Sequence, residues 1–360
     1  MLEILRSWYV RHFSNPEAFM LAFLLLVGFG IVILFGQMLA PVIASIIIAY
    51  LLEGVVGWLI RLGSLRLPAV ILVYTAFLAL LLITLFGLLP LLSRQLTQLV
   101  QDLPTMIAGW QESLLRLPQA YPQIISEAQM NEVMGEIRSE IANLGQRVLS
   151  YSLSTIIGLF TILIYLVLMP LLVFFFLKDK EMIIEWVSGY MPRARGLAYQ
   201  VWEEVDAQIG NYIRGKFIEI MVVWIACYIT FSLMGLRFSL LLSFLVGISV
   251  LIPYVGAVVV TLPVVLVAYS QWGLEADFWY VLIAYLIIQG LDGSILVPLL
   301  FSEVVNLHPI AIITAVLVFG GIWGFWGVFF AIPLATLVQA VLHAWPRGPD
   351  EPAAEGGAGP

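Results

Sequence analysis

Long apolar stretches, separated by short polar ones, dominate the chain. A helix needs about 20 apolar residues to cross a hydrocarbon layer about 30 Å thick. Only helices and closed barrels satisfy their backbone polar groups in lipid, so runs of this length predict an all-α integral membrane protein with about eight membrane segments. These segments are 17–36, 38–60, 68–92, 151–177, 216–235, 238–270, 278–300 and 309–345.

Two of these segments, 238–270 and 309–345, are too long for a single crossing. The first would measure about 50 Å as one straight helix, which is more than tilting absorbs. Each has a helix-breaking sequence near its centre, "IPYVGA" in the first and "GGIWGFWG" in the second. Their length favours two re-entrant hairpins over the alternative of two long, kinked helices.

The two long segments also resemble each other in position. Pro263 and Pro333 differ in number by 70, and the two breaks fall at about the same offset. A transport core, 216–345, with two repeat-like units, 216–270 and 278–340, is therefore predicted. Paired broken segments of this kind are typical of transporters. Re-entrant hairpins would make the two units inverted copies, and single crossings would make them parallel copies.

The polar segments predict the remaining organisation. Spans within 1–92 form a scaffold, and the amphipathic segment 93–150 is a helical insert outside the cytoplasm that serves packing and assembly or caps a ligand site. Segment 178–215, within a unit 151–215, carries several Lys and Arg residues and is expected on the cytoplasmic side. Both termini then lie in the cytoplasm, and 346–360 is expected to be a disordered tail.

The composition excludes several function classes. The chain is 62% hydrophobic and only 11% charged, with a net charge of -7, so a soluble domain and a nucleic-acid-binding protein are both excluded. The single cysteine and three well-separated histidines provide no metal cluster. No cofactor motif and no catalytic cluster is present, so an enzyme is not expected.

Asp292 is the strongest candidate for a functional residue. An ionisable side chain deep in a bilayer costs about 2.5–3.5 kcal/mol and is a functional candidate by default. Gly293 and Pro298 follow it and favour a local break, whose freed carbonyls could join the carboxylate in binding a cation, a proton or a polar solute. Gln289 lies one turn earlier on the same face. The alternative role is a structural hydrogen bond to a neighbouring span.

Polar residues near the cytoplasmic surface form a second candidate group. They sit on one amphipathic helix that either gates the pathway or lies at the interface. Glu219 is expected to pair with Lys216 close to the surface. Glu53 is expected to extend to the interface, and His308 to cap the second long segment, with a proton relay as its alternative role. The gating group comprises Asp206, Asn211, Tyr212, Arg214 and Glu219.

The residues at the two breaks complete the predicted site. Free backbone groups there must face protein or a water-filled cavity. Trp323 and Trp326 flank Gly324 and could stack on a ring-shaped solute or simply pack. The binding residues expected at the breaks are Pro253, Tyr254, Gly256, Trp323 and Gly324, and the structural breaks are Pro263, Pro298, Pro309 and Pro333.

Four stretches in order resemble the autoinducer-2 exporter (AI-2E) family of PerM-like permeases. They are "VDAQIGNYIRGK" (205–216), "LIPYVGAVVVTLP" (251–263), "LDGSILVPLLFSEVVNLHP" (291–309) and "GFWGVFFAIPLATL" (324–337). The resemblance covers nearly the whole chain and implies a bacterial inner-membrane transporter that assembles as a homo-oligomer, possibly a pentamer. The chain departs from the family pattern at Gly293, where Asn is common, and at Lys216, where Gln is common.

Three functions follow from these observations. The first is a secondary transporter that exports a small polar solute, such as an autoinducer-2-like signalling molecule, by alternating access. The second is a sodium (cation)/proton antiporter that uses the same carboxylate. The third is a membrane assembly protein that transports nothing. The expected partners are the lipid bilayer and a small-molecule or ion substrate.

Overall fold

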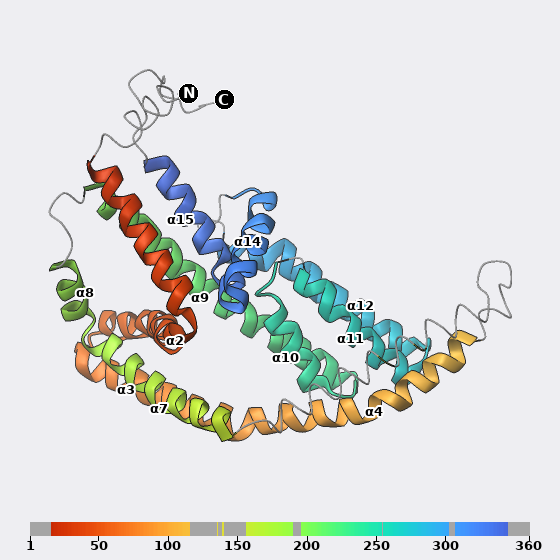
Figure 1. Cartoon of the computed structure of the whole chain (residues 1–360). Coiled ribbons are helices and arrows are strands. Elements are labelled where there is room, and N and C mark those ends of the chain that lie inside the picture. The colour runs from red at the N-terminus through yellow and green to blue at the C-terminus, as the bar shows by residue number, and fades with distance from the viewer. Residues whose placement is uncertain are drawn as a thin grey trace, which may run out of the picture. The chain divides into compact units, whose positions relative to one another are not determined.

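The computed structural model describes residues 16–115, 135, 139, 156–189, 196–253, 255–301 and 307–344. Every regular element in this part of the chain is a helix (Figure 1). Within the described residues, six helical stretches are long and apolar enough to cross a membrane, and shorter apolar helices accompany them. The predicted all-α membrane class is therefore confirmed. The second half of the predicted insert and the tail 346–360 lie outside the described residues.

The chain divides into two compact units, and several long helices contribute to both. Unit 1 comprises Met1–Glu53, Leu172–Arg214 and Phe301–Pro360, and unit 2 comprises Gly54–Leu171 and Gly215–Leu300. Helix α9 (Gly196–Leu233) belongs to unit 1 up to Arg214 and to unit 2 from Gly215 onward. The two predicted hairpins fall in different units.

The first two predicted spans form one continuous helix, α2 (Pro16–Arg61). The predicted division into the spans 17–36 and 38–60 is wrong, because residues 36–41, "GQMLAP", are helical. Pro41 lies inside this helix, and the Ser45 hydroxyl donates a 2.6 Å hydrogen bond to the Pro41 carbonyl. An apolar environment favours continued helical hydrogen bonding even where a proline removes one donor.

The third predicted span continues directly into the polar insert. Helix α3 (Arg66–Ile83), the π-helical turn η1 (Thr84–Leu88) and α4 (Leu89–Leu115) follow one another without a loop (Figure 1). Helix α4 packs on the first hairpin. Its Gln95 side chain accepts a 2.8 Å hydrogen bond from the Leu241 N–H, and its Asp102 forms an ion pair with Arg237 at 2.6 Å.

The next two predicted segments are also continuous helices. The fourth span is α7 (Ile156–Lys178), and a short helix α8 (Lys180–Gly189) follows it. Helix α9 joins the predicted cytoplasmic amphipathic segment and the fifth span in one stretch of 38 residues. The amphipathic residues and the buried residues of the site therefore lie on one helix.

The first long apolar segment is a helical hairpin. Helix α10 (Ser239–Ser249) and helix α11 (Val255–Trp272) pack side by side across a short link, so the chain reverses direction between them (Figure 1). A side chain on Gly256 would overlap the Ser249 carbonyl oxygen, so only glycine fits where the two helices meet. The segment 238–270 is therefore a hairpin and not one long, kinked helix.

The second long apolar segment also reverses. Within α14 (Pro309–Phe329), Gly324 has φ 60° and ψ −134°, a conformation that essentially only glycine adopts. Past this point the chain folds back. Gly327 then lies so close to Phe319 that a side chain on Gly327 would overlap the Phe319 carbonyl oxygen. Helix α15 (Ala331–Ala344) completes the returning arm and packs on α14.

In the sequence, an interrupted helix lies between the two hairpins. Helix α12 (Ala276–Leu291) passes into a π-helical turn, η2 (Asp292–Leu296), and then into α13 (Val297–Phe301). The break predicted next to Asp292 is therefore a π-helical turn. Turns of this kind often occur at functional sites.

Apolar side chains from α9, α10, α11 and α12 form the core of unit 2. Leu242 and Val246 of the first hairpin arm face the same core as Val260 and Val264 of the second. Tyr285 of α12 is fully buried in it. Large apolar side chains that point away from this core cover the helices, as expected for surfaces in contact with lipid.

Candidate functional site

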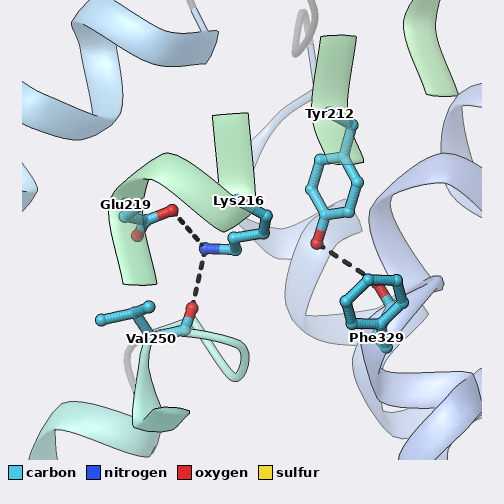
Figure 2. A network of polar contacts seen from close by, with 5 residues as sticks. All are labelled: Tyr212, Lys216, Glu219, Val250 and Phe329. Atoms are coloured by element: carbon cyan, nitrogen blue, oxygen red, sulfur yellow. Dashed lines mark hydrogen bonds and ion pairs between the residues drawn. The ribbon is translucent and has the colours of Figure 1, made fainter. Parts of the chain in front are cut away.

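A buried charge pair on α9 lies next to the reversal of the first hairpin. The Lys216 ammonium donates hydrogen bonds to Glu219 Oε2 at 2.8 Å and to the Val250 carbonyl oxygen at 2.7 Å (Figure 2). The side chains of Lys216 and Glu219 are only 5% and 2% exposed. The predicted pairing is confirmed, but its expected position near the surface is wrong.

The Val250 carbonyl is free to accept this bond because the helix ends there. Val250 is the C-cap of α10, and the carbonyls of the last turn of a helix have no backbone donor within that helix. Pro253 follows in the link, where its fixed φ and missing N–H prevent the helix from continuing. Pro253 and Gly256 thus create the break and the close approach, while Tyr254 lies outside the described residues. The sequence identified the break, but the ammonium that fills it comes from 34 residues earlier in the chain.

Asp292 adds a second carboxylate to this region of unit 2. It begins the π-helical turn η2, and it interacts electrostatically with both Lys216 and Glu219. Its Oδ1 atom is buried and has no hydrogen-bond partner among the described residues. The expected structural hydrogen bond is therefore not made by Oδ1, and this oxygen remains available to a ligand or a proton. Gly293, in the same turn, has open space where a side chain would be.

A chain of hydrogen bonds links α12 to α11. The Gln289 amide donates to the Tyr285 hydroxyl at 2.8 Å, and this hydroxyl lies 2.9 Å from the Thr261 hydroxyl. Thr261 in turn donates to the Ala257 carbonyl at 2.7 Å. Gln289 therefore supports the hairpin arm through Tyr285. Sequence reasoning missed Tyr285 and Thr261, although Tyr285 lies one turn before Gln289 on the same helix face.

A neutral contact occupies the matching place in the second hairpin. The Tyr212 hydroxyl donates to the Phe329 carbonyl oxygen at 3.2 Å (Figure 2). Pro333, four residues later, has no N–H, so it cannot provide the helical bond that this carbonyl would otherwise accept. Tyr212 is 1% exposed and its ring packs on Phe301 and Phe329. Tyr212, predicted as a gating residue, is thus a buried contact of this hairpin.

The tryptophans at the second break differ in their surroundings. Trp326 stacks on Phe330, with the ring centroids 6.3 Å apart and an interplanar angle of 22°. Trp323 lies against Gly36 of α2, where any side chain would collide with the indole. Its buried indole N–H has no hydrogen-bond partner among the described residues. Trp326 therefore packs against aromatic rings, whereas Trp323 packs with its indole nitrogen against Gly36 of α2.

The other predicted gating residues lie in unit 1. Asp206 accepts a hydrogen bond from the Tyr50 hydroxyl of α2. This pair lines a cavity of about 200 Å³, together with Ile47, Ile209 and Phe330 among other residues. Arg214 instead donates to the Asn211 side chain at 2.9 Å. Sequence reasoning missed Tyr50, because nothing in a span of apolar residues distinguishes a tyrosine that meets a carboxylate 156 residues away.

Two further predictions concern helix ends. His308 is the N-cap of α14 and accepts a 3.3 Å hydrogen bond from the Ile310 N–H, so the predicted capping role is confirmed. Pro309 occupies the first turn, where no N–H is needed. Glu53 forms an ion pair with Lys180 at 3.3 Å. The break predicted at Pro263 is wrong, because Pro263 lies inside the continuous helix α11, and a membrane helix tolerates the loss of one backbone donor. Pro298 lies in α13, directly after the π-helical turn η2.

Comparison with known proteins agrees with this architecture. Residues 19–347 match the model of the AI-2E family transporters. The chain is 50% identical to the candidate permease PerM of Escherichia coli (strain K12), covering 97% of this chain and 99% of that protein. It is 27% identical to the candidate transport protein YueF of Bacillus subtilis (strain 168), covering 82% and 81% of the two chains. The chain therefore belongs to the AI-2E transporter family, a bacterial family of multi-span membrane permeases.

Proposed function

We propose that the chain is a secondary transporter that exports a small polar solute by alternating access. The observation that carries this proposal is the buried polar cluster at the first hairpin, formed by Lys216, Glu219, the Val250 carbonyl and Asp292. Charged groups in a membrane segment are costly and are kept where they contact a substrate, an ion or each other. An interrupted helix that presents free backbone groups beside them is the arrangement used by transporters.

The second hairpin supports the same proposal. Its arms also meet at a glycine, and its broken turn also exposes a carbonyl oxygen. Each repeat-like unit therefore contains one such hairpin, and paired broken segments of this kind are typical of transporters of bacterial inner membranes. We place segment 178–215 and the C-terminus in the cytoplasm, because this segment is rich in Lys and Arg and the hairpins return to the side from which they enter. The polar groups suit a neutral, hydroxyl-rich solute, which the Asp292 carboxylate can bind as an acceptor.

The decisive experiment measures solute export with and without the Asp292 carboxylate. Cells that express the wild type, the variant Asp292→Asn or the control Asp277→Asn are compared by mass spectrometry of exported polar metabolites. Asp277 is an exposed residue of the same helix, so its loss should have no effect. We expect Asp292→Asn to lower export of one solute class by at least about tenfold, the effect of losing about 1.4 kcal/mol of interaction.

If all three strains and a deletion strain export the same amount of solute, the result would instead support the function of a membrane assembly protein that transports nothing. That result would leave the buried charges with a structural role only.

A cation/proton antiporter is the second candidate, and the unpartnered Oδ1 atom of Asp292 favours it. A buried carboxylate that binds one proton or one cation at a time is the minimum requirement for such exchange. Proteoliposomes loaded with a pH-sensitive dye test this function directly. A sodium-driven proton flux that Asp292→Asn abolishes would establish antiport, and the absence of flux would exclude it.

A further inference from the structure

The oxygen atoms around the Lys216 ammonium are those that would bind an alkali cation. The ammonium donates hydrogen bonds to a carboxylate oxygen of Glu219 at 2.8 Å and to the Val250 carbonyl oxygen at 2.7 Å. The carboxylate of Asp292 adds further negative charge. In transporters, carbonyl groups at the C-terminal ends of broken helices coordinate the coupling sodium ion or proton. Val250 lies at such an end.

We propose that Lys216 is a tethered cation, whose ammonium permanently fills a monovalent-cation site at the tip of the first hairpin. The chain therefore carries this positive charge covalently and needs no sodium or potassium ion to hold the hairpin closed. This inference rests on the proposed role of the hairpin in transport. It adds that solute movement by this chain is independent of sodium.

The burial of the cluster explains why some cation must be present. Glu219 is 2% exposed, so without the ammonium its carboxylate and the Val250 carbonyl would be buried with no positive partner. A buried carboxylate that loses its partner either becomes protonated or recruits another cation. Replacing Lys216 by a small uncharged residue should leave a space lined by oxygen atoms. A sodium or potassium ion from solution is the chemical class that fits this charge and these ligands.

The test is a measurement of Tm for the purified full-length chain in nanodiscs. Wild type, Lys216→Ala and controls are heated in sodium chloride, potassium chloride or choline chloride of equal concentration. Choline is too large to enter the space. We expect Lys216→Ala to be less stable than wild type in choline, and its Tm to rise by about 2 °C at a sodium or potassium concentration about ten times the Kd. The wild type should have one Tm in all three salts.

Two control variants identify the site of the effect. The Lys180 to Glu53 pair is also a Lys–Glu contact, at 3.3 Å, but it is 46% and 23% exposed. Lys180→Ala should therefore show no difference between sodium and choline. The double variant Lys216→Ala/Glu219→Gln lacks the carboxylate as well as the ammonium, so it should lose the response to sodium.

Either of two results would overturn the proposal. One is a saturable rise in the wild-type Tm with sodium, a measurement that needs no variant. The other is a Lys216→Ala chain that is equally unstable in all three salts. Solute export is measured separately, so a chain that exports nothing but shows the cation response overturns only the transport proposal. A chain that exports a solute without showing the response overturns only the tethered cation.

Discussion

The two hairpins satisfy the same structural need with different chemistry. In each, a backbone carbonyl at the reversal is left without a helical donor, and a side chain of α9 donates to it. The donor is the Lys216 ammonium at 2.7 Å in the first hairpin and the Tyr212 hydroxyl at 3.2 Å in the second. Charge-assisted hydrogen bonds are shorter and about twice as strong as neutral ones. The first hairpin therefore depends on a charge balance, and the second on a neutral contact supported by aromatic packing.

Tyr212 and Lys216 lie four residues apart, so both project from the same face of α9. One helix thus carries the donor for each hairpin, although the hairpins belong to different units. The difference between the donors suggests that the first hairpin responds to ions or protons and that the second provides a constant support. Four sets of variants test this difference.

The largest effect is expected from Glu219→Gln. This change leaves the Lys216 ammonium buried without its carboxylate, and breaking one side of a buried pair costs about 3–5 kcal/mol. The free energy of unfolding, measured for the purified protein in detergent, should fall by that amount. Glu275→Gln is the matched control, because Glu275 is exposed at the start of α12. A loss below about 1 kcal/mol, no larger than a neutral hydrogen bond, would remove the contrast between the hairpins.

Gly256→Ala and Gly327→Ala should have the next largest effect, and the two losses should be similar. An added methyl group would overlap a backbone carbonyl in each case, and overpacking of this kind costs about 1–3 kcal/mol. Gly290→Ala is the control, since Gly290 lies in a helix with open space around it and Ala favours a helix. Thermal unfolding in the same detergent measures all three. Unequal losses would show that only one hairpin requires the close approach.

Tyr212→Phe should cost about 1 kcal/mol, because it removes one neutral hydrogen bond but keeps the ring packed on Phe301 and Phe329. The loss should be the same in sodium and in choline chloride. Tyr280→Phe, at an exposed tyrosine of α12, should change nothing. If the loss from Tyr212→Phe equalled that from Glu219→Gln, the neutral donor would matter as much as the charged one.

The smallest effect is expected from Arg237→Ala. The side chains of Arg237 and Asp102 are 55% and 34% exposed, and exposed pairs contribute about 0.2–1 kcal/mol. Because this pair joins α4 to the start of the first hairpin, a double-mutant cycle with Asp102→Ala should give a coupling energy in that range that decreases with salt. A coupling near zero would mean that Gln95 and apolar packing alone hold α4 against α10.

Sequence reasoning identified the class of protein, the breaks and the candidate carboxylate, but it placed several elements wrongly. Hydropathy located the spans because every residue in contact with lipid must be apolar. It did not show that "GQMLAP" stays helical, because Pro41 costs one hydrogen bond while a loop inside an apolar region would cost several. It placed Lys216 and Glu219 near the surface because their position one turn inside the span says nothing about which elements cover them.

The sequence by itself determined that this is a helical membrane protein with two glycine- and proline-broken segments and an ionisable residue at 292. Local chemistry is sufficient for these features, since apolar runs, prolines and positive-φ glycines act within a few residues. Only the tertiary structure decided that both segments reverse, that Lys216 and Tyr212 bind the freed carbonyls, and that Tyr50 meets Asp206. These contacts join residues from 34 to 156 positions apart, and burial rather than local preference selects them.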